Sequence, residues 1–531
     1  MRIPVGRPGG GAGAPLSPWW RGTAAAAAGA LPAAAFPAPS LWWWAYLALV
    51  PWMLLVRTAP TGRRAALDGW LGGVGFMLAV HHWLMPSLHV FILLLAALLG
   101  LLWAPWGVLV RRMLGGAPSP ARGAAALAVV PSGWLMVELA RSWEGLGGPW
   151  GLLGASQWQV PAVLRVAAVG GVWLVSLLVV AVNTAVVLLV AVPSLRRAAV
   201  AGLVVCGVAV GAAARWVPGP EPAGRVRVGV VQPGVIGGAD GPERRFDRGE
   251  ELTRELAGRD VDLVVWGESS VGTDLAARPG YSARLAALAR EVGAPVLVNV
   301  DARRSDRPGI YKSSVLVGPE GITGDRYDKM RLVPFGEYVP FRSLLGWATS
   351  VGKAAAEDRR RGERPVVMTV GERGPRVGPL VCFESAFPDM SRHLAREGAE
   401  LLVAQSATST FQESWAPGQH ASLAALRAAE TGRPVVHATL TGVSAVYGPD
   451  GGRVGAPLGT EVSGAAVYEV PLAGATTPYV RFGDWAVYAA VAVLAALCAA
   501  GAGRVVRRRP APGTPVPPAR TARGSRVRPG R

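Results

Sequence analysis

Residues 378–385 read Gly-Pro-Leu-Val-Cys-Phe-Glu-Ser, an apolar run of strand length that ends in Cys382. Such a run, preceded by turn residues, predicts a buried β-strand. Cys382 is the only cysteine between positions 225 and 472, so it has no disulfide partner in that region. The pattern alone leaves two interpretations of Cys382 open, an inert buried thiol or a nucleophile.

Two other stretches place charged side chains where a predicted strand ends. Residues 263–268 read Leu-Val-Val-Trp-Gly-Glu, so Glu268 closes a buried strand. Residues 327–340 read Tyr-Asp-Lys-Met-Arg-Leu-Val-Pro-Phe-Gly-Glu-Tyr-Val-Pro, an apolar loop that contains Lys329 and Glu337. Each of these charges alone is more typical of a surface residue or an ion pair. Glu, Lys and Cys at successive strand ends of one domain, however, indicate a catalytic site.

The region around these stretches has the pattern of an α/β domain. Short apolar runs alternate with amphipathic stretches throughout residues 225–472. The predicted strands are 226–231, 263–266, 295–298, 379–382 and 401–404, and the predicted helices are 244–257, 282–292 and 419–431. Strands that alternate with helices in this way predict one α/β domain.

The rest of the chain has the composition of a membrane protein. Only 17% of all residues are charged, against about 25% in soluble domains. Seven apolar segments within residues 18–217 and one within 484–503 are long enough to span a bilayer. They lie near 18–36, 40–56, 68–88, 89–110, 123–140, 160–192, 198–216 and 485–502. Sixteen of the 20 Trp precede position 220. This distribution predicts aromatic belts at the bilayer interfaces, with Trp103 and Trp106 among their members.

Arginine clusters predict the orientation of the spans. The basic loops are 57–64, 111–122 and 196–197. With eight spans, all three loops share one side of the membrane with both termini, and the positive-inside rule makes that side cytoplasmic. The tail 1–17 and the disordered, Arg/Pro-rich tail 504–531 are therefore expected in the cytoplasm. The domain 225–472, inserted before the last span, is expected outside it. These clusters account for the formal net charge of +19, so nucleic acid is not an expected partner.

Several motifs carry a resemblance to a known family. They are Lys329-x-x-Leu-Val-Pro-Phe-Gly-Glu337-Tyr-Val-Pro, Val381-Cys382-Phe383-Glu384, and Pro417-x-Gln419-His420 followed by Arg427-Ala-x-Glu430. In these motifs the domain resembles the nitrilase (carbon–nitrogen hydrolase) superfamily. With the preceding spans, the chain resembles the bacterial apolipoprotein N-acyltransferase family over residues 18–503.

The resemblance implies both a fold and a set of site residues. The fold is a nitrilase-like α-β-β-α sandwich, inserted before the last of about eight transmembrane helices. Cys382 is implied as the nucleophile, Glu268 as the general base and Lys329 as the electrostatic partner. Three further residues are implied to support the pocket: Glu337, Phe383 and Glu384.

The activity implied is acyl transfer through a thioester. A free thiol has a pKa of about 8.5, so Cys382 needs Glu268 to accept its proton and Lys329 to stabilise the thiolate. A phospholipid is implied as the acyl donor. The α-amino group of the N-terminal, diacylglyceryl-modified Cys of a lipoprotein is implied as the acceptor. Two alternatives are left open, a membrane-tethered amidase of the nitrilase type and a non-enzymatic scaffold.

The chain departs from the usual family pattern at several positions. Family members often have Pro before the base and Asn after the Tyr at 311, where this chain has Gly267 and Lys312. The loop at 407–411 reads Ala-Thr-Ser-Thr-Phe where Asn-Asp-x-Trp-Phe is common. The six His and three Cys show no metal-ligand spacing, and no glycine-rich stretch matches a phosphate loop. Neither a metal nor a cofactor is therefore expected.

Overall fold

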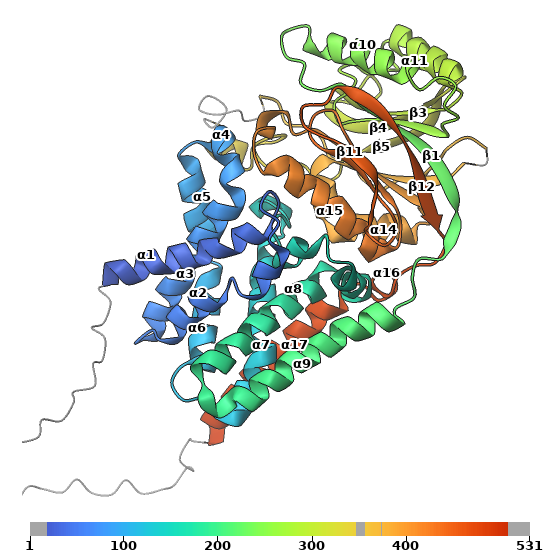
Figure 1. Ribbon diagram of the computed structural model, residues 1–531. Helices are drawn as coiled ribbons and strands as arrows, with labels where there is room; N and C mark the ends of the chain where they lie inside the picture. Colours follow the sequence, from blue (N-terminus) through green and yellow to red (C-terminus); the bar gives the residue numbers. More distant parts are fainter. Residues whose placement is uncertain (1–17, 347–355, 373, 508–531) are drawn as a thin grey trace, which may run out of the picture.

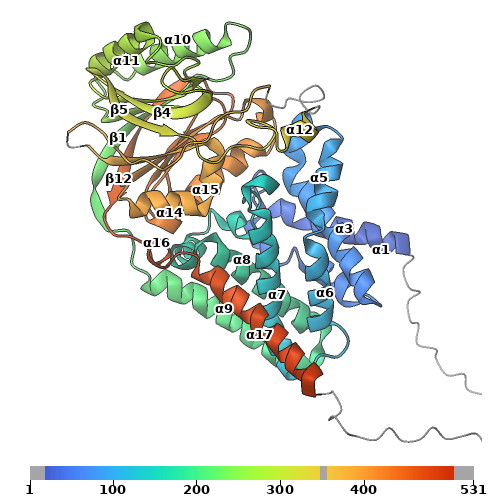
Figure 2. The same cartoon turned by 180° about the vertical axis from the view of Figure 1, so that it is seen from behind.

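The computed structural model describes residues 18–346, 356–372 and 374–507. A helical bundle, built from the first part of the chain and the last helix, carries an α/β domain at one end (Figures 1 and 2). The predicted N-terminal tail, 1–17, and most of the predicted C-terminal tail, 508–531, lie outside the described residues. The last helix continues to Arg507 and so extends into the first residues of that predicted tail.

The bundle contains ten α-helices within the described residues. They are α1 (Pro18–Ala30), α2 (Val50–Arg57), α3 (Gly62–His81), α4 (Met85–Leu88), α5 (Phe91–Gly100), α6 (Trp103–Leu114), α7 (Pro120–Arg141), α8 (Pro161–Ala191), α9 (Arg196–Trp216) and α17 (Trp485–Arg507). In the described chain, α7, α8, α9 and α17 are long and apolar enough to cross a membrane. The pair α5 and α6, bent by 41°, adds a fifth if it counts as one span.

The first three predicted spans are more broken than the sequence suggests. Helix α1 passes into a 3-10 turn at Leu31–Ala35, and the predicted span 40–56 consists of a 3-10 turn, Trp42–Tyr46, followed by the short α2. Proline lies in the first turn of α1, of the turn Leu31–Ala35 and of α2, where a residue without an N–H costs a helix no hydrogen bond. Within the described residues the structure therefore contains several apolar helices, four or five of them of spanning length, where the sequence predicts eight spans.

Several tryptophan side chains pack in the centre of the bundle. Trp52, Trp103, Trp106 and Trp134 are buried, and Trp106 and Trp134 pack edge to face with ring centroids 5.1 Å apart. The prediction that Trp103 and Trp106 belong to an interfacial belt is therefore wrong. Both face neighbouring helices instead of lipid, and hydrophobicity alone does not distinguish these two surroundings.

Two basic loops meet at the end of the bundle far from the α/β domain. Arg57 donates to the carbonyl of Leu114 at 2.9 Å, and Arg111 donates to the carbonyl of Ala59 at 2.7 Å. The C-terminal end of α17 lies at this same end (Figure 1). The basic loops after α2 and α6 thus occupy one end of the molecule, and the α/β domain occupies the other.

The described part of the α/β domain forms two six-stranded sheets. The first has the order β12-β1-β2-β3-β4-β5 and the second the order β11-β10-β9-β8-β7-β6. Their bounds are β1 (Pro222–Gln232), β2 (Leu263–Trp266), β3 (Val296–Arg303), β4 (Ile310–Gly318), β5 (Gly321–Asp328), β6 (Met368–Thr369), β7 (Arg376–Val381), β8 (Leu401–Ser406), β9 (Val435–Thr439), β10 (Ser444–Tyr447), β11 (Arg453–Leu458) and β12 (Gly464–Ala473). Strands β1, β2 and β3 are parallel, as are β7, β8 and β9.

The two sheets pack face to face between two layers of helices. Helices α10 (Gly241–Arg254) and α11 (Pro279–Val292) pack on the first sheet, and α14 (Pro388–Arg396) and α15 (Ala416–Thr431) pack on the second. Gln405 on β8 joins the sheets, since its side chain donates to the carbonyl of Trp266 on β2 at 2.8 Å. The predicted α-β-β-α sandwich is confirmed. Its parallel strands are buried on both faces, which explains why they appear in the sequence as continuous apolar runs.

Helix α15 also joins the domain to the bundle. Helix α8 is interrupted at Gly170 and Gly171, whose backbone angles are not helical. The N–H of Val172, which follows the break, donates to the carboxylate of Glu430 on α15 at 2.6 Å. The interruption of α8 thus provides a main-chain donor for a buried acid of the domain.

Candidate active site

Cys382 stands on a sharp turn directly after β7. It begins a 3-10 turn, Cys382–Ala386, and has a φ of 51°, which is rare for a residue other than glycine. Its carbonyl accepts from the hydroxyl of Ser385 at 2.9 Å and lies 3.1 Å from Nε2 of His420. A strained backbone at a strand-to-helix turn aims a side chain away from the sheet and is typical of nucleophiles.

Glu268 follows β2 and is almost completely buried, with 3% of its surface exposed. Burial alone would raise its pKa, but the ammonium groups of Lys312 and Lys329 prevail and lower the pKa to about 2. A hydrogen bond from the thiol of Cys382 also lowers this pKa. Glu268 is therefore an ionised acceptor in contact with the thiol, the state that a general base requires.

The residue before Glu268 must be small. A Cβ on Gly267 would lie 1.9 Å from the backbone nitrogen of Leu440, which follows β9. The two sheets approach so closely here that only glycine fits. This contact is a structural reason for glycine at position 267, which the pattern of residues alone does not reveal.

Lys329 follows β5 and has no exposed surface. Its Nζ lies 3.2 Å from Oε1 of Glu268 and 2.7 Å from Oε1 of Glu337. Burial opposes its charge, yet both carboxylates hold the pKa of Lys329 well above its ordinary value. The second oxygen of Glu337 accepts from the N–H of Val333 at 2.8 Å, which fixes the loop around the lysine.

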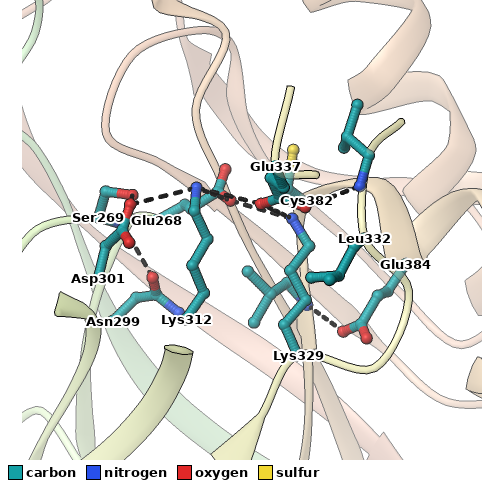
Figure 3. Close-up of polar contacts among 12 residues, drawn as sticks. Glu268, Ser269, Asn299, Asp301, Lys312, Lys329, Leu332, Glu337, Cys382 and Glu384 are labelled. Carbon is teal, nitrogen blue, oxygen red and sulfur yellow. Dashed lines mark hydrogen bonds and ion pairs between the residues drawn. The ribbon is translucent and has the colours of Figure 1, made fainter. Parts of the chain in front are cut away.

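Figure 3 shows that Glu268, Lys329 and Cys382 come together as the sequence predicts, with Glu337 beside them. Burial, followed by the charge of Glu268, raises the pKa of Cys382 to about 12. The resting site therefore contains a neutral thiol, an ionised glutamate and a protonated lysine. A thiol in this state becomes a nucleophile only when a neighbouring base takes its proton.

Glu384 is buried but does not face the thiol. One oxygen accepts from the N–H groups of Met330 and Arg331 and the hydroxyl of Tyr327, and the other accepts from the N–H of Val381. Burial raises the pKa of Glu384. Glu384 thus connects the end of β7 with the start of the Lys329 loop, so it is a structural support of the site.

Phe383 lies between the site and the bundle. Its ring packs edge to face on Phe387 with centroids 4.9 Å apart. Gly148, in the loop after α7, approaches the same ring so closely that a Cβ there would lie 2.5 Å from it. Phe383 therefore contacts the membrane half of the chain.

Aromatic side chains from both halves of the protein lie beside this contact. Trp83 and Trp150 of the bundle both donate to the side-chain oxygen of Gln419 on α15, at 3.1 and 2.8 Å. Phe411 belongs to the loop at 407–411, whose sequence differs from the family pattern. Its ring packs on Trp83 at a centroid distance of 5.0 Å. The sequence motifs contain Gln419, but they give no indication of the bond between α15 and the bundle.

Lys312 belongs to the same charge cluster, although the sequence pattern assigned it no role there. It lies on β4 and was noted only as a departure, yet its Nζ is 2.8 Å from Oε1 of Glu268 and 3.3 Å from Oε1 of Glu337. The available signal in the sequence was the charge itself, because Lys312 lies in a strand that is otherwise largely buried.

Among the described residues, no group of three or more His, Cys, Asp or Glu is placed to hold a metal ion.

Comparisons with known proteins give matches for both halves of the chain. Residues 28–185 match the family described as apolipoprotein N-acyltransferase N-terminal domain, and residues 227–477 match carbon-nitrogen hydrolase. A protein of Geobacter metallireducens named apolipoprotein N-acyltransferase is 30% identical over 498 residues, which cover 88% of this chain and 93% of that protein. One of the same name from Azotobacter vinelandii is 33% identical over 501 residues, with the same coverage. Among solved structures, an amidase from Nesterenkonia sp. is 20% identical, with a TM-score of 0.34 over 48% of this chain and 92% of that one.

Proposed function

Because the chain belongs to the apolipoprotein N-acyltransferase family, we propose that Cys382, Glu268 and Lys329 are the catalytic triad of its acyl transfer. One observation carries this proposal. The Glu268 carboxylate, whose charge raises the pKa of the Cys382 thiol, also pairs with the buried ammonium of Lys329 at 3.2 Å. A nucleophile, a base and a cation therefore lie together, as covalent acyl transfer requires.

The first half-reaction forms a thioester. Glu268 takes the thiol proton while sulfur attacks the ester carbonyl of the donor, and the developing oxyanion is stabilised by Lys329 and a backbone N–H beside Cys382. The C–O bond then breaks, and the leaving alkoxide receives the proton from Glu268. The donor leaves with one acyl chain fewer, and the chain remains on Cys382. A single oxyanion donor typically contributes a factor of roughly 10²–10³ in kcat.

The second half-reaction forms the amide. The α-amino group of the acceptor attacks the thioester carbonyl and Glu268 removes a proton from the nitrogen. The C–N bond forms, the C–S bond breaks, and the thiol of Cys382 is restored with the proton that Glu268 received. Two consecutive half-reactions on one cysteine predict ping-pong kinetics.

The donor we propose is a phospholipid, and the acceptor is the N-terminal diacylglyceryl cysteine of a lipoprotein. Both are lipids held in a bilayer. The position of the α/β domain at one end of the apolar bundle supports access from the membrane surface (Figure 2). Contact of Phe383 with the loop after α7 supports it as well, because the residue beside the nucleophile then adjoins the membrane half.

The proposed topology has eight spans and places the α/β domain outside the cytoplasm. The domains are an N-terminal tail at 1–17, a seven-helix region at 18–217, the catalytic domain at 225–472, a last span at 484–503 and a tail at 504–531. Arg57 and Arg111 gather at the end of the bundle opposite to the α/β domain, which supports this sidedness through the positive-inside rule.

Mass spectrometry of the full chain in phospholipid vesicles tests the triad. The unmodified chain and Cys498→Ser, which alters an exposed cysteine of α17, should gain a fatty-acyl mass that hydroxylamine removes. Cys382→Ala should gain none, and Lys329→Ala should gain it at least about a hundredfold more slowly. A diacylglyceryl-cysteine peptide added to the acylated protein should receive the chain as an amide. Release of free fatty acid in place of the amide would overturn the transferase assignment.

A further inference from the structure

A second ammonium group belongs to the buried charge cluster around the nucleophile. Oε1 of Glu268 lies 2.8 Å from Lys312 and 3.2 Å from Lys329, and Oε1 of Glu337 lies 3.3 Å from Lys312 and 2.7 Å from Lys329. Each carboxylate therefore contacts both lysines, which closes a ring of four charges. Figure 3 shows both ammonium groups directed at this pair of acids, with the sulfur of Cys382 nearby.

The backbone fixes Lys312 in this ring. It lies on β4 opposite Asp301 of β3, and its carbonyl accepts from the N–H of Lys329 at 2.8 Å. Only 13% of its side chain is exposed, so the ammonium group is not a solvated surface charge. A buried cation in such a position is stable only with paired anions around it.

The charges of the ring balance only when Lys312 is present. Two ammonium groups face two carboxylates, Glu268 and Glu337. Asp301, which lies 3.7 Å from Lys312, is also paired with Arg359 at 3.3 Å. Without Lys312, Lys329 alone would face both buried acids, and one acid would tend to take up a proton because like charges at close range do not both ionise.

On the basis of the proposed acyl transfer, we propose that Lys312 is a positioning residue of the reaction. It holds Glu268 ionised and in place, so that Lys329 is free to bind the oxyanion that develops on the donor. Lys312 acts through Glu268 and Glu337 and not on the reacting atoms.

The sign of the expected pH effect follows from the charges around the ring. The titratable groups there are Glu268 after β2, Asp301 on β3, Lys329 after β5, Glu337 in the loop at 329–340, Arg359, Cys382 after β7 and His420 on α15. Both lysines lower the pKa of Cys382 and of Glu268. Loss of the Lys312 charge therefore raises both pKa values, and the pH profile moves towards higher pH.

Alkylation of Cys382 by iodoacetamide tests this inference on the full chain in phosphatidylethanolamine–phosphatidylglycerol vesicles. Peptide mass spectrometry follows the rate at Cys382 from pH 6 to 10. Lys312→Met should need a pH higher by about one unit or more to reach the rate of the unmodified chain, and Lys312→Arg should restore the original profile. If Lys312→Met does not fold, Lys312→Gln replaces it and should show the same shift of the alkylation profile to higher pH.

The outcomes separate this inference from the proposed function. If Lys312→Met has an unchanged profile, or if Lys312→Arg moves as far as Lys312→Met, the positioning assignment is overturned even when the unmodified chain forms a thioester. If the profile moves as expected but the unmodified chain never acquires an acyl group from the vesicles, Lys312 acts as stated and the acyl-transfer proposal fails.

Discussion

Glu144, in a 3-10 turn after α7 of the bundle, accepts a hydrogen bond from the backbone N–H of Leu332 at 3.1 Å. Leu332 belongs to the loop that carries Lys329 and Glu337. Two arginines of the domain, Arg331 and Arg361, also lie 3.5 and 2.9 Å from the Glu144 carboxylate, which is almost fully buried. The membrane half of the chain therefore contacts the loop of Lys329 directly.

Replacement of Glu144 by Ala should slow thioester formation about tenfold. The N–H of Leu332 would lose its partner, and an unsatisfied buried group costs roughly 1–3 kcal/mol, so the loop would shift away from its catalytic position. The measurement is single-turnover acylation of Cys382 by phospholipid vesicles. Asp389→Asn is the matched control, because it removes another partner of Arg331, at 2.8 Å but half-exposed, and exposed pairs contribute about 0–1 kcal/mol. Equal rates in the two variants would show that Glu144 does not position the loop.

Glu384→Gln should lower both stability and activity. The carboxylate accepts from three backbone N–H groups and the hydroxyl of Tyr327. An amide offers one acceptor oxygen, so its NH₂ group would face at least one of these donors. We expect a loss of about 1–3 kcal/mol, seen as a lower midpoint of thermal unfolding in detergent. The exposed Glu397→Gln serves as control. An unchanged midpoint in Glu384→Gln would contradict the supporting role.

The sequence predicted the residues at strand ends and missed the residue inside a strand. Glu268 and Cys382 each follow an apolar run, β2 in the first sheet and β7 in the second, and the face-to-face packing of the two sheets brings these strand ends together. Lys312 stands within β4, where a polar residue is equally compatible with the solvent face. Only the register of β4 against β3 and β5 places its ammonium group in the site.

The helices of the bundle were harder to predict than the sheets. A buried parallel strand and its flanking turns are local in sequence, so β2 was predicted with its observed bounds, Leu263–Trp266. Whether an apolar residue faces lipid or another helix depends on packing between distant segments. Trp103 shows this, because it lies fully buried against Trp52 and Trp134 although its sequence suits an interface.

Gly267→Ala should abolish thioester formation. The added methyl group would lie 1.9 Å from the backbone nitrogen of Leu440, so one of the two strand ends would have to move and carry Glu268 with it. Gly280→Ala on α11, where nothing lies within 4 Å of the added Cβ, should leave the acylation rate unchanged. Intact mass spectrometry after incubation with phospholipid measures both. Acylation of Gly267→Ala at the original rate would mean that this contact does not position the base.

Glu268→Gln should make Cys382 more reactive towards iodoacetamide while it abolishes acyl transfer. The charge of Glu268 raises the pKa of the thiol, so its removal lowers that pKa and increases the thiolate fraction at pH 8. Alkylation needs only the thiolate and should become faster by several-fold. Acylation needs a group that accepts the thiol proton and later returns it to the leaving group, which an amide does not do. Parallel measurement of both rates at Cys382 checks the prediction. Alkylation that slows together with acylation would show that Glu268 stabilises the thiolate or the local fold, and that it is not the general base.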